Sequence, residues 1–500
     1  MRLPQHLVGT RCCASVPVSA VCNRRVEEGQ LGECPSAPTS RTAAGSRRHE
    51  RASVLIIVLW VSFGLVSLAI YFANSSSLEL RAADNRVATL EAEQAIAGAA
   101  RYISNALANV TEPGVPPDPA TLKVEAVQVG TARYWLIGQP LDEEDDLDVT
   151  FGLVDEASKL NLNTATAAML NKLPRMTAEL GAAIVDWRDE DSDPSENGAE
   201  DEIYARLNPP YRCKNAKFES IEELRLVYGF TYDILYDEDA NMNAVLDRNE
   251  DDEDATSPND NHDGVLNRGV LAYVTVHSKQ SNLRTNGEPK VDISTVDPAA
   301  LARLMTEAGL GNDRVQQVIQ RFSANGPPPG GTNQPPPSGN NTNGSVLQFY
   351  IRSGMSAEEF HLIENDLTTS TNAVIEGLVN VNTATSTVLA CLPGLDAEKA
   401  DALVATRSGT DTQHSIAWLK DALEAQVAEQ LGPFITGRSY VYTADIAALG
   451  HHGRGYSRVK FVFDTTEGGA KVRQRLDLTH LGWALGQEVR RQIAESQNTP

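Results

Sequence analysis

One uncharged segment near the start of the chain most constrains what this protein can fold into. Residues 53–73 read SVLIIVLWVSFGLVSLAIYFA, a run of 21 positions without a charge. About 20 apolar residues in a helix are enough to cross the hydrocarbon core of a bilayer. The preceding residues 47–51 (RRHER) are basic, and basic flanks stay on the cytoplasmic side of a membrane. We therefore expect one membrane crossing, with the C-terminal bulk of the chain translocated.

Three interpretations of this segment compete. A secretory signal peptide has a shorter apolar core and a cleavage site after it, whereas residues 74–109 continue as a helix-forming sequence. A plain signal anchor would have the observed length. A pilin-type signal is cut before the apolar run, which is then retained in the mature protein. The junction between Ala52 and Ser53 resembles such a cleavage site, although Ala stands where Gly is usual.

The charge balance limits the partners of the chain. Its 500 residues include 67 acidic and 43 basic ones, a net charge of −24. Such a chain repels phosphate backbones, which disfavours a general role in binding nucleic acid. Carboxylates suit divalent cations instead. Only two of the six cysteines, Cys213 and Cys391, follow the apolar segment, and the sequence leaves open whether they are bonded or free.

Three segments begin alike and predict an internal repeat. The copies start at residues 160–166 (LNLNTAT) and 379–385 (VNVNTAT), with a weaker one at 291–297 (VDISTVD). Each is followed by an apolar helix pattern, a short turn and a second helix, which covers roughly 177–188 in the first copy and 397–407 in the last. The residues expected to cap the first helices are Thr164, Ser294 and Thr383.

These repeats resemble helix-hairpin-helix units, which often bind DNA. DNA binding needs a glycine-rich hairpin whose N–H groups reach phosphate, together with nearby cations. The first hairpin, residues 173–176, has no glycine, and in the last one Gly394 is followed by Asp396 and Glu398. The pattern favours packing units of a helical domain, and DNA binding stays the main rival interpretation.

Strand patterns flank the repeats on both sides. Residues 133–138 and 149–155 precede them, and residues 439–447, 457–465 and 471–478 follow them. A glycine-rich turn between the last strands carries His451 and His452, which we expect to be exposed rather than metal-bound. The last strands can complete a sheet begun before residue 155. The predicted fold is therefore α+β, with a long N-terminal helix, an antiparallel sheet and a large α-helical insertion.

Two acidic regions carry calcium-ligand spacing. In residues 239–250, oxygen-bearing side chains occupy the first, third, fifth, ninth and twelfth positions of an EF-hand loop, but Ala244 replaces the usual glycine. A second loop from residue 259 has Gly264, but Val270 stands at its twelfth position. Solvated acidic loops are the alternative. The predicted ligands are Asp239, Asn241, Asn243, Asp247 and Glu250, then Asn259, Asn261 and Asp263, and in the earlier acidic region Asp189, Asp191, Glu200 and Asp201.

No sequence motif of catalysis stands out. The chain contains no metalloprotease helix, nucleophile elbow or phosphate-binding loop. We therefore predict that it is not an enzyme.

Several strings resemble protein K of type II secretion systems, a minor pseudopilin. They are the junction around residues 52–53, DEASKLNLN at 155–163, DWRD at 186–189, NGAED at 197–201, FESIEEL at 218–224 and DLTHLGW at 477–483. Most pilins carry Glu at the fifth mature position, where this chain has Ile57, an absence typical of protein K. A carboxylate there would pair with a neighbouring subunit inside lipid, where an unpaired charge is costly. Ile57 thus suits a subunit at the filament tip.

The resemblance implies a pilin-like architecture and an export function. The parts would be a leader (1–52), a transmembrane and amphipathic helix (53–110), the first part of the sheet (120–158), a helical insertion (159–436) with an acidic calcium-loop region (237–270) and a Pro/Gly-rich loop (326–344), and C-terminal strands (437–500). The implied partners are minor pseudopilins I and J, the major pseudopilin and prepilin peptidase. Calcium in the ectodomain, N-methylation at Ser53 and a single-pass inner-membrane location with a periplasmic domain are also implied. A competence-type DNA-binding membrane protein and a type IV pilus minor pilin remain the alternatives.

Overall fold

The computed structural model describes residues 49–118, 122–140, 149–252, 255–294, 297–323, 344–408 and 414–498. Residues 1–48 of the expected leader and almost all of the Pro/Gly-rich loop 326–344 lie outside these ranges. The chain divides into two compact units, residues 1–76 and 77–500. The two units are described separately.

The described part of the first unit is helical. Helix α1 runs from His49 to Ala108 without interruption at Gly98, and its residues up to Ser76 form this unit. The side chains from Val54 to Phe72 are exposed throughout. Among the described residues, α1 is the one helix that is long and apolar enough to cross a membrane. The expected long helix is thus confirmed, and its apolar start can serve as a membrane span by length and composition.

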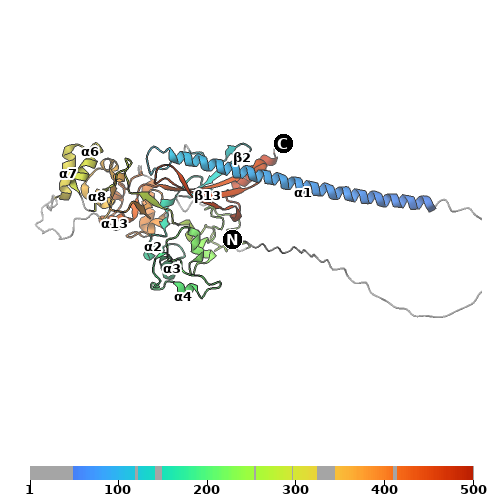
Figure 1. Ribbon diagram of the computed structural model, residues 1–500, viewed down its shortest axis with the longest axis horizontal. Helices are drawn as coiled ribbons and strands as arrows, with labels where there is room; N and C mark the ends of the chain where they lie inside the picture. Colours follow the sequence, from blue (N-terminus) through green and yellow to red (C-terminus); the bar gives the residue numbers. More distant parts are fainter. Residues whose placement is uncertain are drawn as a thin grey trace, which may run out of the picture. The chain divides into compact units, whose positions relative to one another are not determined.

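The second unit is built on an antiparallel sheet (Figure 1) with the strand order β1-β2-β12-β13-β14, while β3 also pairs with β12. The central strand β12 pairs with β2 on one side and β13 on the other, so strands from both sides of the insertion meet as predicted. The strands are Val127–Val129 (β1), Ala132–Ile137 (β2), Val154–Asp155 (β3), Val441–Leu449 (β12), Ser457–Asp464 (β13) and Lys471–Asp477 (β14). The strand expected at residues 149–155 is shorter than predicted, because Phe151 makes only an isolated bridge.

Alternate residues of this sheet face different layers, because side chains alternate along a strand. On one face, Leu136 and Ile446 pack against Ile96 and Ile103 of α1. On the other face, Trp135 and Ile137 form a second apolar cluster with Leu485 and Val489. Val489 belongs to helix α14, Gly486–Asn498, which the sequence patterns did not predict.

Each repeat of the insertion is closed by a short parallel strand pair. The first strand of each copy pairs with a strand far along the chain, which gives its backbone N–H and C=O groups partners in the interior. The pairs are Leu160–Asn161 (β4) with Val274–Thr275 (β5), Val291–Asp292 (β7) with Leu367–Thr368 (β8), and Val379–Asn380 (β10) with Ile435–Thr436 (β11). The three predicted repeat starts therefore mark three closed units.

Each closed unit contains the expected helix, turn and second helix. The pairs are Ala167–Leu170 (α2) with Ala178–Arg188 (α3), Pro298–Glu307 (α6) with Asn312–Ser323 (α7), and Ser386–Ala390 (α10) with Ala397–Ser408 (α11). The turns contain Arg175, Gly309 and Gly394, all with positive φ, between 58° and 90°. The prediction that these helix pairs have the crossing geometry of helix-hairpin-helix units stays a prediction.

The predicted helix caps were wrong by two or three residues. Thr166, Asp297 and Thr385 cap the first helices by accepting backbone N–H groups. The predicted caps lie in the turn that follows each strand, and their hydroxyls donate to Asn161 O, Asp292 Oδ1 and Asp155 Oδ2, respectively. This turn must be completed before the helix can begin.

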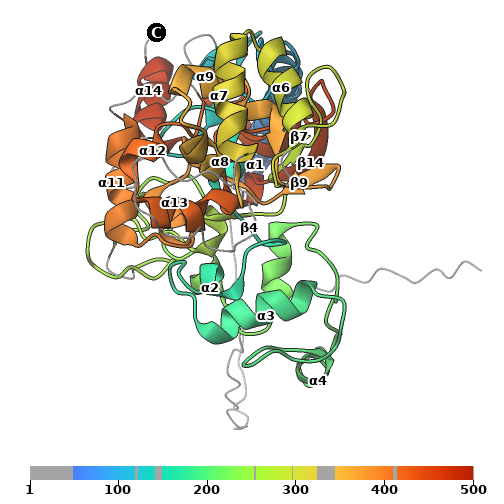
Figure 2. The same ribbon diagram turned by 90° about the vertical axis from the view of Figure 1, so that its left-hand side faces the viewer.

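The remaining elements complete the insertion. Figure 2 shows α2, α3 and α4 apart from the group formed by α6, α7, α8 and α11–α13. The helices not yet given are Asp201–Tyr204 (α4), Tyr232–Leu235 (α5), Val346–Ser353 (α8), Ala357–His361 (α9), Leu419–Ala422 (α12) and Ala425–Leu431 (α13). The remaining strands are Lys279–Ser281 (β6) and Val374–Glu376 (β9). The 3-10 turns are Glu156–Ser158 (η1), Ile221–Leu226 (η2), Val270–Ala272 (η3), Glu364–Asp366 (η4), Gly432–Phe434 (η5), His451–Gly453 (η6) and Thr479–Leu481 (η7).

His451 is docked rather than exposed, so the expectation of an exposed histidine pair was wrong for this residue. Its Nδ1 lies 2.8 Å from Glu91 Oε2 and its Nε2 lies 2.9 Å from Asp84 Oδ1, both on α1. The turn approaches the helix closely because Gly450 has no side chain. A Cβ atom there would come within 2.1 Å of the Ala88 carbonyl oxygen.

Candidate metal centre

The loop at residues 239–250 folds around its own polar side chains. The Asp239 carboxylate accepts the backbone N–H groups of Asn243 and Ala244 at 2.9 and 3.1 Å. Ala244 takes a φ of 58°, the left-handed conformation that glycine supplies at this position of an EF-hand loop. The loop therefore makes the turn that its sequence pattern predicted, although its turn residue is alanine.

The other predicted ligands of this loop lie beside one another. Glu250 accepts the N–H groups of Ala240 at 3.2 Å and Asp247 at 2.9 Å, which brings the twelfth position back to the second and ninth. Asp247 Oδ2 accepts from the side-chain amides of Asn241 and Asn243 at 2.7 and 3.0 Å. Calcium ligation here would require the two amides to turn so that their oxygens face the ion.

Burial makes the charges of this loop costly. Asp239, Asp247 and Glu250 are all buried. Burial raises the pKa of Asp239 and of Asp247, and burial together with the neighbouring Asp239 charge raises the pKa of Glu250 to about 8. Among the residues that the structure describes, the buried Asn241 Oδ1 has no hydrogen-bond partner. A divalent cation would neutralise this set.

No ready-made metal centre accompanies this chemistry. Within the ranges that the structure describes, no three His, Cys, Asp or Glu side chains converge closely enough to hold an ion by themselves. Calcium at these residues therefore stays a prediction, in which amide and backbone oxygens would have to contribute.

The second loop obtains its missing carboxylate from Glu238. Glu238 Oε1 accepts the N–H of Asn261 at 3.0 Å, and its Oε2 accepts the N–H of Asn267 at 2.8 Å. In the first loop, Glu250 binds the ninth-position N–H in the same way. Val270, at the twelfth position of the second loop, is buried in η3. Sequence reasoning missed Glu238, because it precedes the first loop and carries no spacing signal for the second.

The predicted ligands of the second loop are mostly solvated. Asn259, Asn261 and Asp263 are all exposed, and Asp263 Oδ2 accepts from the Asn261 side chain at 2.9 Å. Gly264 takes the left-handed φ of 69° that the pattern predicted. These three side chains are solvated, and calcium at this loop stays a prediction.

The earlier acidic region contains a buried carboxylate without partners. Glu200 is 3% exposed, and neither of its carboxylate oxygens has a hydrogen-bond partner among the described residues. Burial raises the pKa of Glu200, with the Asp189 and Asp186 charges adding to this effect. Asp189 Oδ1 likewise has no hydrogen-bond partner in the described part of the chain. This arrangement suits a cation close to Asp189 and Glu200.

The other two predicted ligands of this region have backbone partners. Asp201 accepts the N–H of Cys213 at 2.8 Å, and Asp191 accepts the N–H of Asp193 at 2.9 Å.

The structure also answers the question that the sequence left open about the cysteines. Cys213 and Cys391 are not bonded to each other.

Arg458 fastens the first loop to the sheet. Its side chain is fully buried on β13, and its Nη2 donates to Met242 O at 2.9 Å while its Nη1 donates to Asn241 O. The Asn241 side chain also donates to Trp483 O at 3.0 Å. The loop is therefore held by two segments more than 200 positions away in the sequence.

Residues 154–237 match the family model of the type II secretion system (T2SS) protein K. The predicted strings DEASKLNLN, DWRD, NGAED and FESIEEL all lie within these residues. This segment, which we call the protein K segment, is thus similar to that family. The protein K segment includes Asp189 and the buried Glu200, whereas both EF-hand-like loops follow it.

Two curated relatives support this assignment. The type II secretion system protein K of Pectobacterium carotovorum subsp. carotovorum is 50% identical over 56 residues, which are 11% of this chain and 17% of that protein. The protein K of Klebsiella pneumoniae is 42% identical over 60 residues, 12% of this chain and 18% of that protein. The matched part of the chain thus spans under a fifth of these relatives.

A solved structure also aligns with the chain. The crystal structure of the GspK–GspI–GspJ complex from the enterotoxigenic Escherichia coli type 2 secretion system aligns over 78% of this chain and 96% of that one. The sequence identity is 11% and the TM-score is 0.34. The fold assignment rests on the strands and helices of the chain itself.

Two predicted features of a protein K junction lie at the start of α1. Ala52 and Ser53, the expected cleavage residues, belong to the helix. Ile57, at the expected fifth mature position, is 61% exposed. Cleavage between Ala52 and Ser53 stays a prediction.

Proposed function

We propose that this chain is a non-enzymatic minor pseudopilin, the tip subunit of a type II secretion pseudopilus that acts in protein export across the outer membrane. The observation that carries this proposal is the protein K segment at residues 154–237, placed in a chain with an apolar N-terminal helix. In this proposal, α1 anchors the protein as a single span in the inner membrane, and the rest of the chain lies in the periplasm.

The proposed tip position rests on Ile57. A subunit whose fifth mature residue is apolar offers no carboxylate to the N-terminal ammonium of a neighbour inside lipid, where an unpaired charge is costly. Prepilin peptidase would cut between Ala52 and Ser53, and the new N-terminus would be methylated. The processed helix would then enter the filament from the membrane.

The proposed partners are minor pseudopilins I and J and the major pseudopilin. An exposed apolar stripe on α1 supports a helix-packing role in the second unit. Leu80, Val87 and Leu90 recur at helical spacing and are 71%, 50% and 58% exposed. A helix from a neighbouring subunit would bury this stripe.

Calcium is the proposed cofactor of the ectodomain. The buried carboxylates of the 239–250 loop and the buried Glu200 support it, because each would be neutralised by a divalent cation. A ligand that binds only the folded protein must stabilise it. A melting temperature that chelation leaves unchanged would contradict this part of the proposal.

The DNA-binding alternative has less support from the hairpins. Lys172, beside the first hairpin, donates to the backbone oxygens of Ala390, Leu392 and Leu395 at 2.8 to 3.2 Å. Arg175 of the same hairpin pairs with Asp237. These two cations are therefore engaged within the protein, whereas DNA binding needs cations free to reach phosphate.

Co-purification from membranes tests the proposal. The tagged full-length chain should capture minor pseudopilins I and J and should begin at an N-methylated Ser53 in mass spectrometry. Selective capture of type IV pilus minor pilins would favour that alternative. Salt-dependent DNA binding by the purified chain would favour a competence-type protein. An N-terminus that retains the residues before Ser53 would contradict pilin-type processing.

A further inference from the structure

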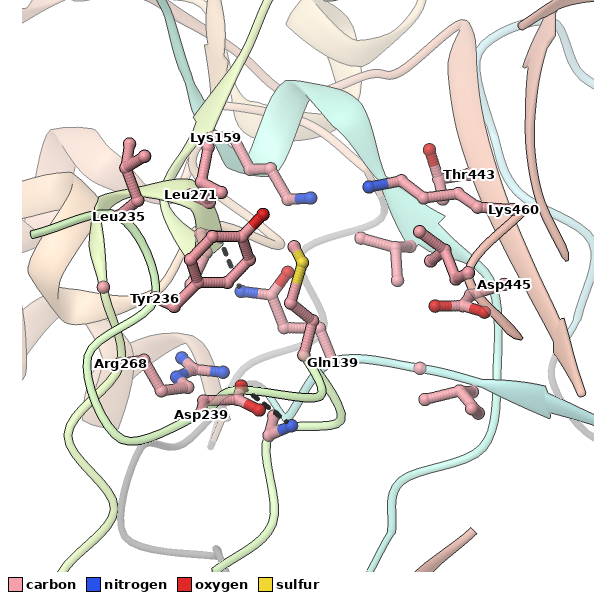
Figure 3. A pocket seen from close by; sticks show the side chains of 18 residues that line it. Gln139, Lys159, Leu235, Tyr236, Asp239, Arg268, Leu271, Thr443, Asp445 and Lys460 are labelled. Atoms are coloured by element: carbon pink, nitrogen blue, oxygen red, sulfur yellow. Dashed lines mark hydrogen bonds between the residues drawn. The ribbon is translucent and has the colours of Figure 1, made fainter. Parts of the chain in front are cut away.

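A cavity with charged side chains in a largely apolar wall lies on the sheet face opposite α1. Its volume is about 80 Å³. A buried water needs about 10–15 Å³ of such space, so this cavity is large enough for a small polyatomic ligand but not for a nucleotide or a lipid. Figure 3 shows charged groups along its wall, among them Lys159, Asp239, Arg268, Asp445 and Lys460.

Two lysine side chains enter this cavity from opposite sides. Lys460 belongs to β13, where alternation places it on the same face as Arg458 and away from α1. Lys159 directly follows η1, at the start of the insertion. Figure 3 shows the two ammonium ends pointing toward one another. Like charges in such an arrangement are unfavourable unless an anion lies between them.

Two acidic groups lie nearby: Asp445 is already paired, and Glu156 faces both lysines, whose charges lower its pKa against the effect of burial. Asp445 forms a bidentate pair with Arg458 at 2.9 and 2.7 Å. Glu156 lies 3.6 Å from Lys159 Nζ and accepts the hydroxyls of Thr275 and Thr443.

One cation therefore remains without a direct partner. No hydrogen bond or ion pair to Lys460 Nζ exists within the part of the chain that the structure describes. Burial lowers the pKa of Lys460, and the Lys159 charge adds to this effect, whereas Glu156 and Asp445 oppose it.

A neutral donor completes the cavity wall. The Tyr236 hydroxyl lines the cavity and accepts a hydrogen bond from Arg225, which leaves its own proton free to donate. The ammonium groups of Lys159 and Lys460 and the Tyr236 hydroxyl are together three donors, which can bind the oxygens of a tetrahedral anion.

We propose that this cavity binds a small inorganic oxyanion, of the phosphate or sulfate class, between Lys159 and Lys460. The anion would neutralise the surplus positive charge and join β13 of the sheet to the first residues of the insertion. It would thus stabilise the attachment of the insertion to the sheet. This site is independent of the proposed secretion function, since it rests only on groups within the second unit.

Thermal unfolding of the purified full-length chain in detergent tests the site. Sodium phosphate and sodium sulfate are compared with sodium chloride at equal ionic strength, with a chelator present to remove any effect of calcium. We expect phosphate and sulfate to raise the melting temperature in a saturable manner, because an anion bound only to the folded state stabilises it. An equal rise in chloride would overturn the proposal.

Lys460→Met tests the site by removing one of its two lysines. We expect this variant to lose the phosphate response, and in anion-free buffer to be at least as stable as the original protein, because it removes a poorly compensated charge. Lys471→Met is the control, since Lys471 is exposed on β14 and pairs with Glu467. A Lys460→Met protein that keeps the full phosphate response would overturn the proposal.

Phosphorus NMR gives a second measurement that needs no variant. The resonance of inorganic phosphate should broaden when the original protein is added, and added sulfate should reverse the broadening by competition. A phosphate resonance that the protein leaves unchanged would overturn the proposal even if Lys460→Met fails to fold.

Discussion

Arg458 and Asp445 form a buried bidentate ion pair, with Nε–Oδ1 and Nη2–Oδ2 distances of 2.9 and 2.7 Å. The same guanidinium donates to Met242 O at 2.9 Å. One side chain thus connects two strands of the sheet to the first EF-hand-like loop. The geometry of the 239–250 loop therefore depends on a residue of the C-terminal meander.

Replacing this arginine should destabilise the folded protein strongly. Arg458→Met leaves the Asp445 carboxylate in the interior without its partner, and we expect the free energy of unfolding to fall by about 3–5 kcal/mol. Chemical denaturation of the full chain measures it. Arg491→Met is the control, because Arg491 and Glu488 form an exposed pair worth at most about 1 kcal/mol. Equal effects of the two variants would contradict a structural role for the buried pair.

Glu238 should contribute to calcium binding although it lies outside both predicted loops. Glu238→Gln keeps the shape of the side chain but removes its charge, and we expect calcium affinity at the second loop to fall about tenfold or more. Glu250→Gln should do the same at the first loop. Isothermal titration calorimetry measures affinity and stoichiometry, with the exposed Glu288→Gln as control. Unchanged calcium binding in both variants would argue that these carboxylates serve only to hold the loops.

The contact of His451 with α1 should depend on pH. Hydrogen bonds to Asp84 and Glu91 raise the pKa of His451 in the folded protein. A raised folded pKa means that the stabilisation is fully present below the unfolded pKa of about 6.5 and is lost as the pH rises through the folded value. Asp84 and Glu91 have lowered pKa values, so their contribution is lost only in acid, below their ordinary range. Arg454 also faces Asp84 and keeps its charge throughout.

Hydrogen exchange in the 450–455 turn checks this prediction. We expect protection of these amides to be greater at pH 6 than at pH 9, after correction for intrinsic exchange rates. His451→Gln should remove most of this difference, whereas His452→Gln should retain it. A turn whose protection is the same at both pH values in the original protein would refute the prediction.

Gly198 should tolerate no side chain. A Cβ atom there would lie 1.9 Å from Asp186 Oδ2 and 2.8 Å from Ser195 Oγ. Asp186 is fully buried and bonded to Ser195, so it cannot move away easily. We expect Gly198→Ala to lower the free energy of unfolding by about 1–3 kcal/mol. Gly152→Ala is the control, because its Cβ would meet no atom within 4 Å; a larger loss for this control would refute the steric argument.

The sequence predicted the strands of the sheet better than it predicted helix α14 and the helix caps of the repeats. Strands β12, β13 and β14 are short runs separated by glycine-rich turns, so the local sequence marks where each begins and ends. Helix α14 was missed because its sequence, GQEVRRQIAESQN, is almost wholly polar and presents few apolar positions to the core. The helix caps were displaced because the turn after each repeat strand has its own hydrogen bonds.

In the candidate site, too, contacts between neighbouring residues were predictable and contacts between distant residues were not. The first loop was predictable because its ligands lie within twelve consecutive positions and contact one another. Glu238 and Arg458 were not, since their contacts join residues 29 and 216 positions apart. Whether Cys213 and Cys391 are bonded to each other was equally undecided until their positions were known.

The sequence alone determined the apolar helix, the repeat starts, the C-terminal strands and the ligand spacing of one loop. These features depend on local periodicity and turn chemistry, which neighbouring residues encode by themselves. Tertiary structure decided which carboxylates are buried, which acid completes the second loop and that Lys159 faces Lys460. Burial and electrostatic environment depend on segments that are distant in the sequence, and they become defined only when the insertion packs against the sheet.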